Sequence, residues 1–260
     1  MPKLKFVKMQ KNKITTIPLV NLIPSIITMF ALCLGTTAIR YALEAKFDIA
    51  AALIIVASIM DGLDGRVARL LNSTSNFGAQ LDSLADLVSF GVAPSMTLYL
   101  WALHQLTYKG VGWAVVLFYI TCSAFRLARF NVQASDQPEK KGNNFFTGVP
   151  ITAAANLVML PLVITFNITE YRIPNAFIAL YVVLIGILMI SQLPTFSGKK
   201  VHVRREYVLP LLGLTGVMMA GILIEPWFVL PLMGVGYILT IPVSVVYYYR
   251  FYNNKKYQEK

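Results

Sequence analysis

The sequence from Asp61 to Asp86 reads DGLDGRVARLLNSTSNFGAQLDSLAD, and a long apolar run flanks it on each side. It contains four of the six aspartates in the 260-residue chain. A carboxylate close to hydrocarbon is energetically costly, and inside a membrane segment it indicates a functional site. The stretch therefore predicts two membrane helices joined by a short turn, with a site that both helices carry.

Beyond this stretch the chain is mostly apolar, with 57% hydrophobic and 13% charged residues, whereas soluble domains carry about 25% charged residues. About 20 apolar residues in a helix cross a bilayer. No long alternating pattern of a membrane strand is present, so we expect an all-α polytopic membrane protein. Apolar runs predict eight spans, near 19–41, 47–71, 78–106, 111–133, 149–168, 174–193, 207–224 and 227–249. Because only Glu225 and Pro226 join the last two, a re-entrant pair is the alternative there.

The basic residues indicate how the spans are oriented. The net charge is +11, but the charges form short clusters between apolar runs. This pattern is typical of membrane topology and of contact with anionic lipids, and we expect no nucleic-acid partner. If the N-terminus is cytoplasmic, 19 of the 23 basic residues lie inside. We therefore expect both termini in the cytoplasm, with the turn near residue 74 at the same face.

The spacing of the aspartates predicts that their side chains meet. Asp61 and Asp64 are three residues apart, and Asp82 and Asp86 are four apart, so each pair lies on one helix face. The polar stretch from Asn72 to Asn76 is the turn between the helices. Measured from this turn, the two pairs lie at similar depths in an antiparallel hairpin.

Four carboxylates packed together repel one another unless a cation lies between them. Oxygen ligands without a nearby histidine or cysteine favour a hard ion, Mg²⁺ or Mn²⁺, with Ca²⁺ as an alternative, over zinc. Such ions suit phosphoryl transfer, in which they neutralise developing charge. Gly65, Ala68 and Gly78 keep the same face free of bulk, and Arg69 presents a fork suited to a phosphate.

These residues resemble the signature of the CDP-alcohol phosphatidyltransferase family. That signature is Asp-x-x-Asp-Gly-x-x-Ala-Arg, eight residues, and then Gly-x-x-x-Asp-x-x-x-Asp, and every fixed position is filled between Asp61 and Asp86. The resemblance implies a six-helix catalytic core, here with two additional C-terminal helices. The corresponding division is a basic N-terminal segment 1–18, a core 19–193 with the motif at 61–86, a loop and two helices over 194–249, and a basic tail 250–260.

The resemblance also implies roles for single residues. The metal ligands would be Asp61, Asp64, Asp82 and Asp86, with Asp86 also the general base. The CDP-lipid contacts would be Gly65, Ala68, Arg69, Ser75 and Gly78. Many members begin the first span with Pro-Asn-x-x-Thr, whereas this chain has Ser25 after its proline. A nucleotide contact from position 25 is therefore in doubt, and Thr28 is a weaker CDP-lipid candidate.

Three further stretches resemble the phosphatidylserine synthases of bacterial membranes, namely 89–94, 126–131 and 146–150. They imply CDP-diacylglycerol and L-serine as substrates, a location in the bacterial inner membrane with the site near its cytoplasmic face, and a homodimer. Arg126, Arg129 and Asn131 are the candidates for binding serine. The two arginines suit the serine carboxylate or a lipid phosphate equally well.

Three other functions remain open at this point. Glycerol 3-phosphate or another alcohol could replace serine as acceptor in the same reaction. A divalent-cation transporter also uses intramembrane carboxylates, although here they are confined to one hairpin. The third alternative is a scaffold without activity.

Overall fold

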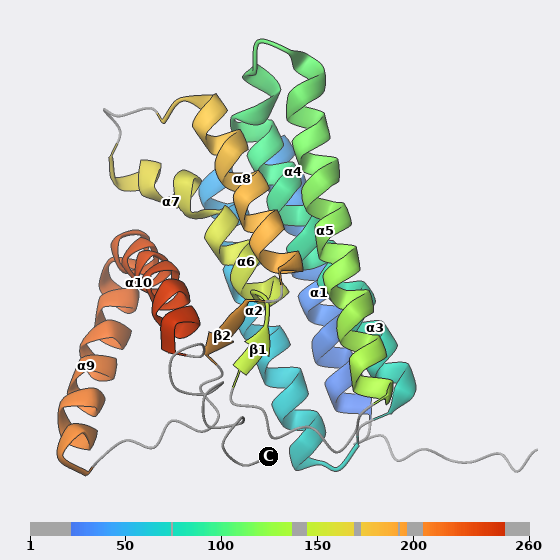
Figure 1. Ribbon diagram of the computed structural model, residues 1–260, viewed down its shortest axis with the longest axis vertical. Coiled ribbons are helices and arrows are strands. Elements are labelled where there is room, and N and C mark those ends of the chain that lie inside the picture. Colours follow the sequence, from blue (N-terminus) through green and yellow to red (C-terminus); the bar gives the residue numbers. More distant parts are fainter. Residues whose placement is uncertain are drawn as a thin grey trace, which may run out of the picture.

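The computed structural model describes residues 22–73, 75–136, 145–168, 173–191, 193–196 and 205–247. In these ranges the chain is a bundle of long helices with one small sheet (Figure 1). The elements are α1 (Ile23–Leu43), α2 (Phe47–Leu70), α3 (Asn76–Asp86), the π-helical turn η2 (Leu87–Val92), α4 (Ala93–Trp101), the short 3-10 helix η3 (Leu103–Gln105), α5 (Lys109–Asp136), β1 (Phe145–Thr147), α6 (Ile151–Val158), α7 (Leu160–Asn167), α8 (Asn175–Ile190), β2 (Pro194–Phe196), α9 (Arg205–Ile224) and α10 (Pro226–Tyr247).

The all-α polytopic membrane fold predicted from sequence is confirmed. Five helical segments of the described chain are long and apolar enough to cross a membrane, and two shorter apolar segments cover 151–167 and 175–190. The helix α2 is just as long, but aspartates and arginines occupy its second half. Both α9 and α10 have the length of full spans, which favours two crossings over a re-entrant pair.

Two helices near the N-terminus pack closely because small residues line their contact. In α1 the buried stripe consists of Ala31, Gly35, Ala38 and Ala42, and α2 contributes Ala50, Ala51, Ile54 and Ala57. Small residues at such spacing let helix backbones approach one another in a membrane. The same face of α2 continues to Asp64, which is also buried, so this packing brings an aspartate against α1.

Proline interrupts two of the predicted spans, and the span predicted near 149–168 is divided into two helices. That region forms α6 and α7, separated at Met159, with Pro161 in the first turn of α7. Proline cannot donate to the carbonyl four residues earlier, here that of Leu157. The hydroxyl of Tyr181 donates a hydrogen bond to that carbonyl at 2.9 Å, which compensates for the missing bond.

The third span has the same arrangement. It runs from α3 through η2 to α4, and Pro94 lies in the first turn of α4. The carbonyl of Phe90, four residues before Pro94, accepts a hydrogen bond from the buried Tyr119 hydroxyl at 3.3 Å. The π-helical turn begins directly after Asp86. The hydrogen bond from Tyr119 of α5 stabilises it. Such turns often occur beside functional sites.

The sequence did not predict the small antiparallel sheet. In it β1 pairs with β2, with Phe146 opposite Thr195. Gly148 follows β1 with φ of 77°, and a Cβ there would lie 2.6 Å from the carbonyl oxygen of Ser191. Only glycine fits this left-handed, crowded position. The sheet joins the start of α6 to the segment after α8.

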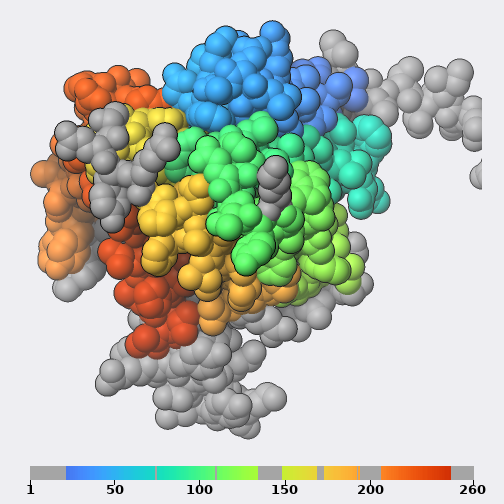
Figure 2. All heavy atoms as spheres, turned by 90° about the horizontal axis from the view of Figure 1, so that it is seen from above, coloured from blue at the N-terminus to red at the C-terminus, as the bar shows by residue number. Residues whose placement is uncertain are grey.

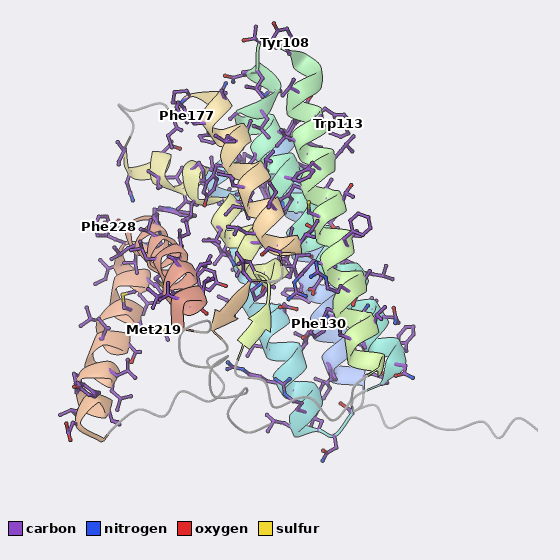
Figure 3. All side chains as sticks on the ribbon, in the orientation of Figure 1. Tyr108, Trp113, Phe130, Phe177, Met219 and Phe228 are labelled. Carbon is purple, nitrogen blue, oxygen red and sulfur yellow. The ribbon has the colours of Figure 1, made fainter. Side chains whose placement is uncertain are left out.

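The surface of the bundle is that of a lipid-facing protein. Large apolar side chains are exposed on several helices, among them Trp113, Phe177 and Phe228 (Figure 3). At the turn between α1 and α2, Glu44 forms ion pairs with Arg40 at 3.3 Å and Lys46 at 2.8 Å. These are two of the four basic residues that the orientation prediction places outside, and Glu44 offsets part of their charge.

The C-terminal helices α9 and α10 lie along one side of the bundle (Figures 1 and 2). No residue in the apolar window of α9 is buried, whereas α10 packs against α7 and β2. The predicted cytoplasmic basic clusters fall mostly outside the described residues, so the orientation of the protein stays a prediction. The division into a core and an appended pair is likewise a prediction.

Candidate active site

The aspartates of the motif meet between the second half of α2 and α3, at the lower end of the bundle in Figure 1. Asp61, Asp64 and Asp82 each offer a carboxylate oxygen, and these three atoms lie within 4.8 Å of one another. The carboxyl group of Asp86 lies beside that of Asp61. The convergence expected from the spacing of the aspartates is therefore what the structure shows.

The arrangement fits a divalent cation. Two unit charges about 4 Å apart repel by about 4 kcal/mol at an effective dielectric constant of about 20, so metal-free carboxylates at this spacing destabilise one another. The Oδ1 atom of Asp82 is buried and has no hydrogen-bond partner among the described residues. A buried acceptor normally has a partner. Hard cations take this kind of all-oxygen ligand set.

A threonine from α1 holds one of the ligands in place. The Thr28 hydroxyl donates a 2.6 Å hydrogen bond to Asp64 Oδ2, and its oxygen lies 3.0 Å from the carbonyl of Pro24. Both Thr28 and Asp64 are buried. The sequence prediction gave Thr28 a contact with the CDP-lipid, and the structure shows its hydroxyl on Asp64. Groups that orient metal ligands in this way strengthen metal binding.

The turn between the two helices follows from its residues. Asn72 has φ of 48°, a left-handed conformation that asparagine tolerates better than most residues. Ser75 caps α3, since its hydroxyl accepts a 3.0 Å hydrogen bond from the N–H of Gly78. A Cβ on Gly78 would lie 3.8 Å from the hydroxyl oxygen of Ser25. Ser25, Ser75 and Gly78 thus meet at one place, where α1 faces the start of α3.

The face of α2 beside the aspartates is open. A Cβ added at Gly62 or Gly65 would have no atom within 4 Å. Ala68 is half-buried, and Arg69 is exposed near the end of the helix. The predicted CDP-lipid residues on α2 therefore border free space, which a flat nucleotide could approach closely.

The last turn of α3 is held by an asparagine from α5. Asn131 Nδ2 donates to the Ser83 hydroxyl oxygen at 3.0 Å, and Ser83 lies between the two aspartates of α3. Just beyond Asp86, Ser89 packs so closely against Gly35 of α1 that a Cβ at Gly35 would be 2.6 Å from the Ser89 Cα. The helix that carries Asp86 is thereby fixed from α1 and from α5.

The two candidate arginines lie on another face of α5. Arg126 is buried and donates from Nε to the carbonyl of Val149 at 3.3 Å. Arg129 donates to the carbonyl of Ile190. No ion pair joins either arginine to an acid within the described ranges. The structure thus brings Asn131 to the aspartate-bearing helix, while the arginines tie α5 to the segments around β1 and α8.

Sequence reasoning missed the contacts between helices at this site. The signal for Thr28 was its place in a proline-led motif, but nothing in the sequence indicated an aspartate as its partner. Ser83 was passed over because a serine between two aspartates is an ordinary helix residue. Both residues show their roles only when the helices are placed together.

The fold and the site define a polytopic membrane protein with a cluster of carboxylates, suited to a divalent cation, at one end of a helical hairpin. A sequence model described as CDP-alcohol phosphatidyltransferase matches residues 21–196, and another described as CDP-alcohol phosphatidyltransferase 2 matches residues 206–242. The chain belongs to the CDP-alcohol phosphatidyltransferase family, and the resemblance inferred from the motif is confirmed.

Several curated relatives carry the name CDP-diacylglycerol–serine O-phosphatidyltransferase. The protein of Mycobacterium tuberculosis strain H37Rv is 36% identical over 227 residues, which are 86% of this chain and 78% of that protein. The protein of Helicobacter pylori strain 26695 is 38% identical over 182 residues, 69% of this chain and 74% of its own. The Bacillus subtilis protein is 39% identical over 147 residues, 56% of this chain and 78% of its own.

Proposed function

We propose that this protein transfers the phosphatidyl group from CDP-diacylglycerol to the hydroxyl of L-serine and releases CMP. The observation that carries the proposal is the convergence of Asp61, Asp64 and Asp82 oxygens within 4.8 Å, one of the carboxylates having a buried oxygen without a partner among the described residues. The shared name of the relatives supports CDP-diacylglycerol and serine as the substrates.

In this proposal Asp61, Asp64 and Asp82, with Asp86, hold Mg²⁺ or Mn²⁺, and Ca²⁺ is an alternative. The bound ion supplies neutralising charge for the diphosphate and for the departing phosphate. Thr28 keeps the Asp64 carboxylate in its orientation. Gly65 leaves room for the cytidine diphosphate, whereas a Cβ at Gly78 would lie 3.1 Å from the Ser75 hydroxyl oxygen. In this proposal Ala68, Arg69, Ser75 and Gly78 border the same space.

Asp86 is the proposed general base. It accepts the proton of the serine hydroxyl while the hydroxyl oxygen forms a bond to the lipid-bearing phosphorus. The bond from that phosphorus to the bridging oxygen breaks, and CMP leaves with the electron pair. General bases of this kind act over hydrogen-bond distance and contribute about 100- to 10,000-fold to the rate.

Serine would enter from the side of α5. Asn131, which contacts Ser83 between the two aspartates of α3, is the candidate nearest to the base. Arg126 and Arg129 each donate one hydrogen bond to a backbone carbonyl. A guanidinium group has five N–H donors in all. The other donors can serve the serine carboxylate.

An acceptor panel tests the assignment. The purified protein in mixed micelles would receive CDP-diacylglycerol and Mg²⁺ or Mn²⁺, and CMP release would be measured with serine, glycerol 3-phosphate and no acceptor. We expect release that depends on serine. Release with glycerol 3-phosphate alone would sink the serine assignment, and metal flux across proteoliposomes without CDP-lipid would favour the transporter alternative.

We further propose that the site opens to the cytoplasmic face of a bacterial inner membrane, because Arg66 and Arg69 lie next to the α2–α3 turn and basic residues favour that face. A single cysteine placed at Asn72 should react with a membrane-impermeant maleimide in inverted vesicles and stay unlabelled in intact cells. The homodimer stays a prediction from the resemblance, and light scattering of the detergent-solubilised protein measures it.

A further inference from the structure

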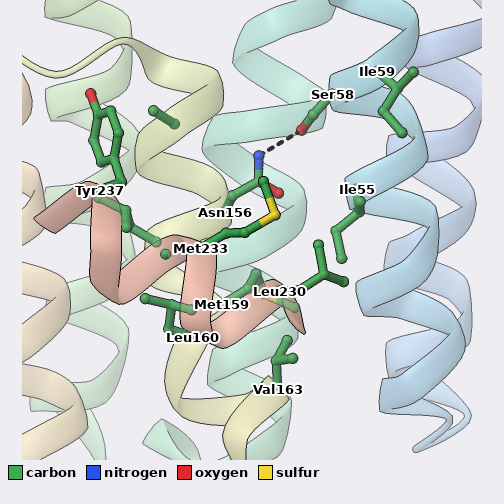
Figure 4. Close-up of a pocket in the computed structure, with 13 residues that line it drawn as sticks. Ile55, Ser58, Ile59, Asn156, Met159, Leu160, Val163, Leu230, Met233 and Tyr237 are labelled. Atoms are coloured by element: carbon green, nitrogen blue, oxygen red, sulfur yellow. Dashed lines mark hydrogen bonds between the residues drawn. The ribbon is translucent and has the colours of Figure 1, made fainter. Parts of the chain in front are cut away.

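A pocket lies one helical turn away from the aspartates, between α2, the α6–α7 pair and α10. Its volume is about 320 Å³, at the lower end of the range for ligand pockets of about 300–1,000 Å³. From α2 it is lined by Ile55, Ser58 and Ile59, and from α10 by Leu230 and Tyr237 among others (Figure 4). The helix α10 therefore supplies one wall of it.

The lining of this pocket suits hydrocarbon. Most of the residues around it are aliphatic. Two of its polar residues bond to each other, since Asn156 Nδ2 donates to the Ser58 hydroxyl oxygen at 3.1 Å (Figure 4). Asn156 Nδ2 also donates to the Thr152 carbonyl at 2.9 Å. Their hydrogen-bonding capacity is thus largely used within the protein. The remaining surface selects for an apolar chain.

The pocket lies beside the candidate active site along α2, since Ile59 lines it and Asp61 follows two residues later. Ser58 precedes Asp61 by three residues, which is about 4.5 Å along a helix, and lies farther from the α2–α3 turn. Between the pocket and Arg69 the helix carries Gly62 and Gly65, where an added Cβ would meet no atom within 4 Å. These glycines leave room for the diphosphate beside Asp61 and Asp64, and the pocket begins about one helical turn farther from the α2–α3 turn, at the distance expected for the start of an acyl chain.

The position of α10 is set by a close contact. A Cβ at Gly234 would lie 2.6 Å from Leu160 Cδ2, so glycine lets α10 approach α7 and close the pocket on that side. One turn along, Tyr237 lies near the buried Arg126 of α5. The outer wall is thus fixed by its contact with α7 and lies close to the helix that faces the site.

We propose that this pocket receives one acyl chain of the CDP-activated lipid and that α10, as its outer wall, determines which chains are accepted. The inference rests on the proposed function, because it takes the lipid substrate from it. The bilayer is itself apolar, so the pocket gains little from removing a chain from water. Its contribution is to position the glycerol backbone and to exclude chains that do not fit.

Filling the pocket tests the proposal. In Leu230→Trp the larger side chain should obstruct the pocket, whereas Leu232→Trp places the same side chain at an exposed position of α10. We expect Leu230→Trp to lower kcat/KM for dipalmitoyl CDP-diacylglycerol about tenfold while leaving the dihexanoyl substrate within about twofold. The control variant should change neither. Equal effects on both substrates, or no effect on either, would overturn the proposal.

A binding experiment without serine separates this inference from the proposed reaction. A CDP-diacylglycerol with a diazirine at the middle of an acyl chain would be photolysed with the wild-type protein, and labelled peptides would be identified by mass spectrometry. We expect labels between residues 226 and 247, suppressed by excess CDP-diacylglycerol and not by phosphatidylglycerol. Labels found only outside the segments that line the pocket, namely 55–59, 153–163 and 230–237, or equal suppression by both lipids, would contradict an acyl site for this substrate even if CMP release is normal.

Discussion

The proline-interrupted spans and the α2–α3 hairpin differ in whether their buried polar groups have hydrogen-bond partners. Where Pro94 and Pro161 deprive a carbonyl of its helical donor, a tyrosine hydroxyl from a neighbouring helix compensates. In the hairpin, three carboxylates crowd together and an Asp82 oxygen has no partner among the described residues. Because unpaired groups are costly in a membrane, the first region favours stability, whereas the second has the unpartnered oxygen that the proposed cation site requires.

The largest effect should come from removing the unpartnered ligand. Asp82→Asn should lower serine-dependent CMP release at least about 1,000-fold, since a lost metal ligand removes several kcal/mol of transition-state stabilisation. In EDTA the variant should unfold at the same temperature as the wild type or higher, because one of the repelling charges is gone. Thermal unfolding followed in detergent checks this, and a clearly lower melting temperature would show that Asp82 serves the fold.

Substitution of the proposed base should lower turnover much more than it lowers affinity for the lipid substrate. Asp86→Asn should reduce kcat about a hundredfold to a thousandfold, while affinity for CDP-diacylglycerol stays within about threefold. Equilibrium binding of a fluorescent CDP-lipid, measured beside CMP release, gives both quantities. A variant that loses lipid binding as fully as turnover would place Asp86 among the binding residues only.

A smaller effect, on the metal requirement, is expected for Thr28, which orients the proposed metal ligand Asp64. Thr28→Val should raise the Mn²⁺ concentration for half-maximal activity about 10- to 100-fold, because Asp64 loses its 2.6 Å hydrogen bond. Thr28→Ser keeps the hydroxyl and should restore most of the metal affinity. If valine and serine variants titrate alike, the contact has no role in metal binding.

The smallest effect is expected on stability, for a substitution in the proline-interrupted third span. Tyr119→Phe should lose about 0.6–1.7 kcal/mol of stability, the range for hydrogen bonds between membrane helices, with activity nearly unchanged. In a Pro94→Ala background the new backbone N–H can donate to the Phe90 carbonyl itself, so the same tyrosine change should cost less. A double-mutant cycle of unfolding free energies measures the difference, and purely additive costs would contradict the proposed compensation.

Much of this architecture could be predicted from the sequence because apolar length and charge spacing are local properties. The predicted spans and the convergence of the aspartates both follow from counting residues along helices. The break at Met159 was missed, although Pro161 marks it, because a proline in a long apolar run is compatible with a single kinked span. The sheet pairs β1 with β2, which lie far apart in the chain, and such pairings leave no local pattern.

At the candidate site, too, contacts between distant parts of the chain could not be predicted from the sequence. The candidate ligands were predicted from the motif, whereas the partners of Thr28, Asn131 and Arg126 depend on which helix faces which. Arginines near a helix end are equally suited to a substrate carboxylate and to a backbone carbonyl, and only the packed structure shows the carbonyls of Val149 and Ile190 beside them. The pocket beside α10 also arises from packing alone.

The most direct test of the account is Mn²⁺ binding to the purified protein, followed by electron paramagnetic resonance in the presence of CDP-diacylglycerol. The wild-type protein should bind Mn²⁺ at one or two sites with loss of the free-ion signal, and Asp82→Asn should weaken that binding at least about tenfold. A protein that binds no Mn²⁺ under these conditions, or a variant that binds it as tightly as the wild type, would contradict a cation site built from these aspartates.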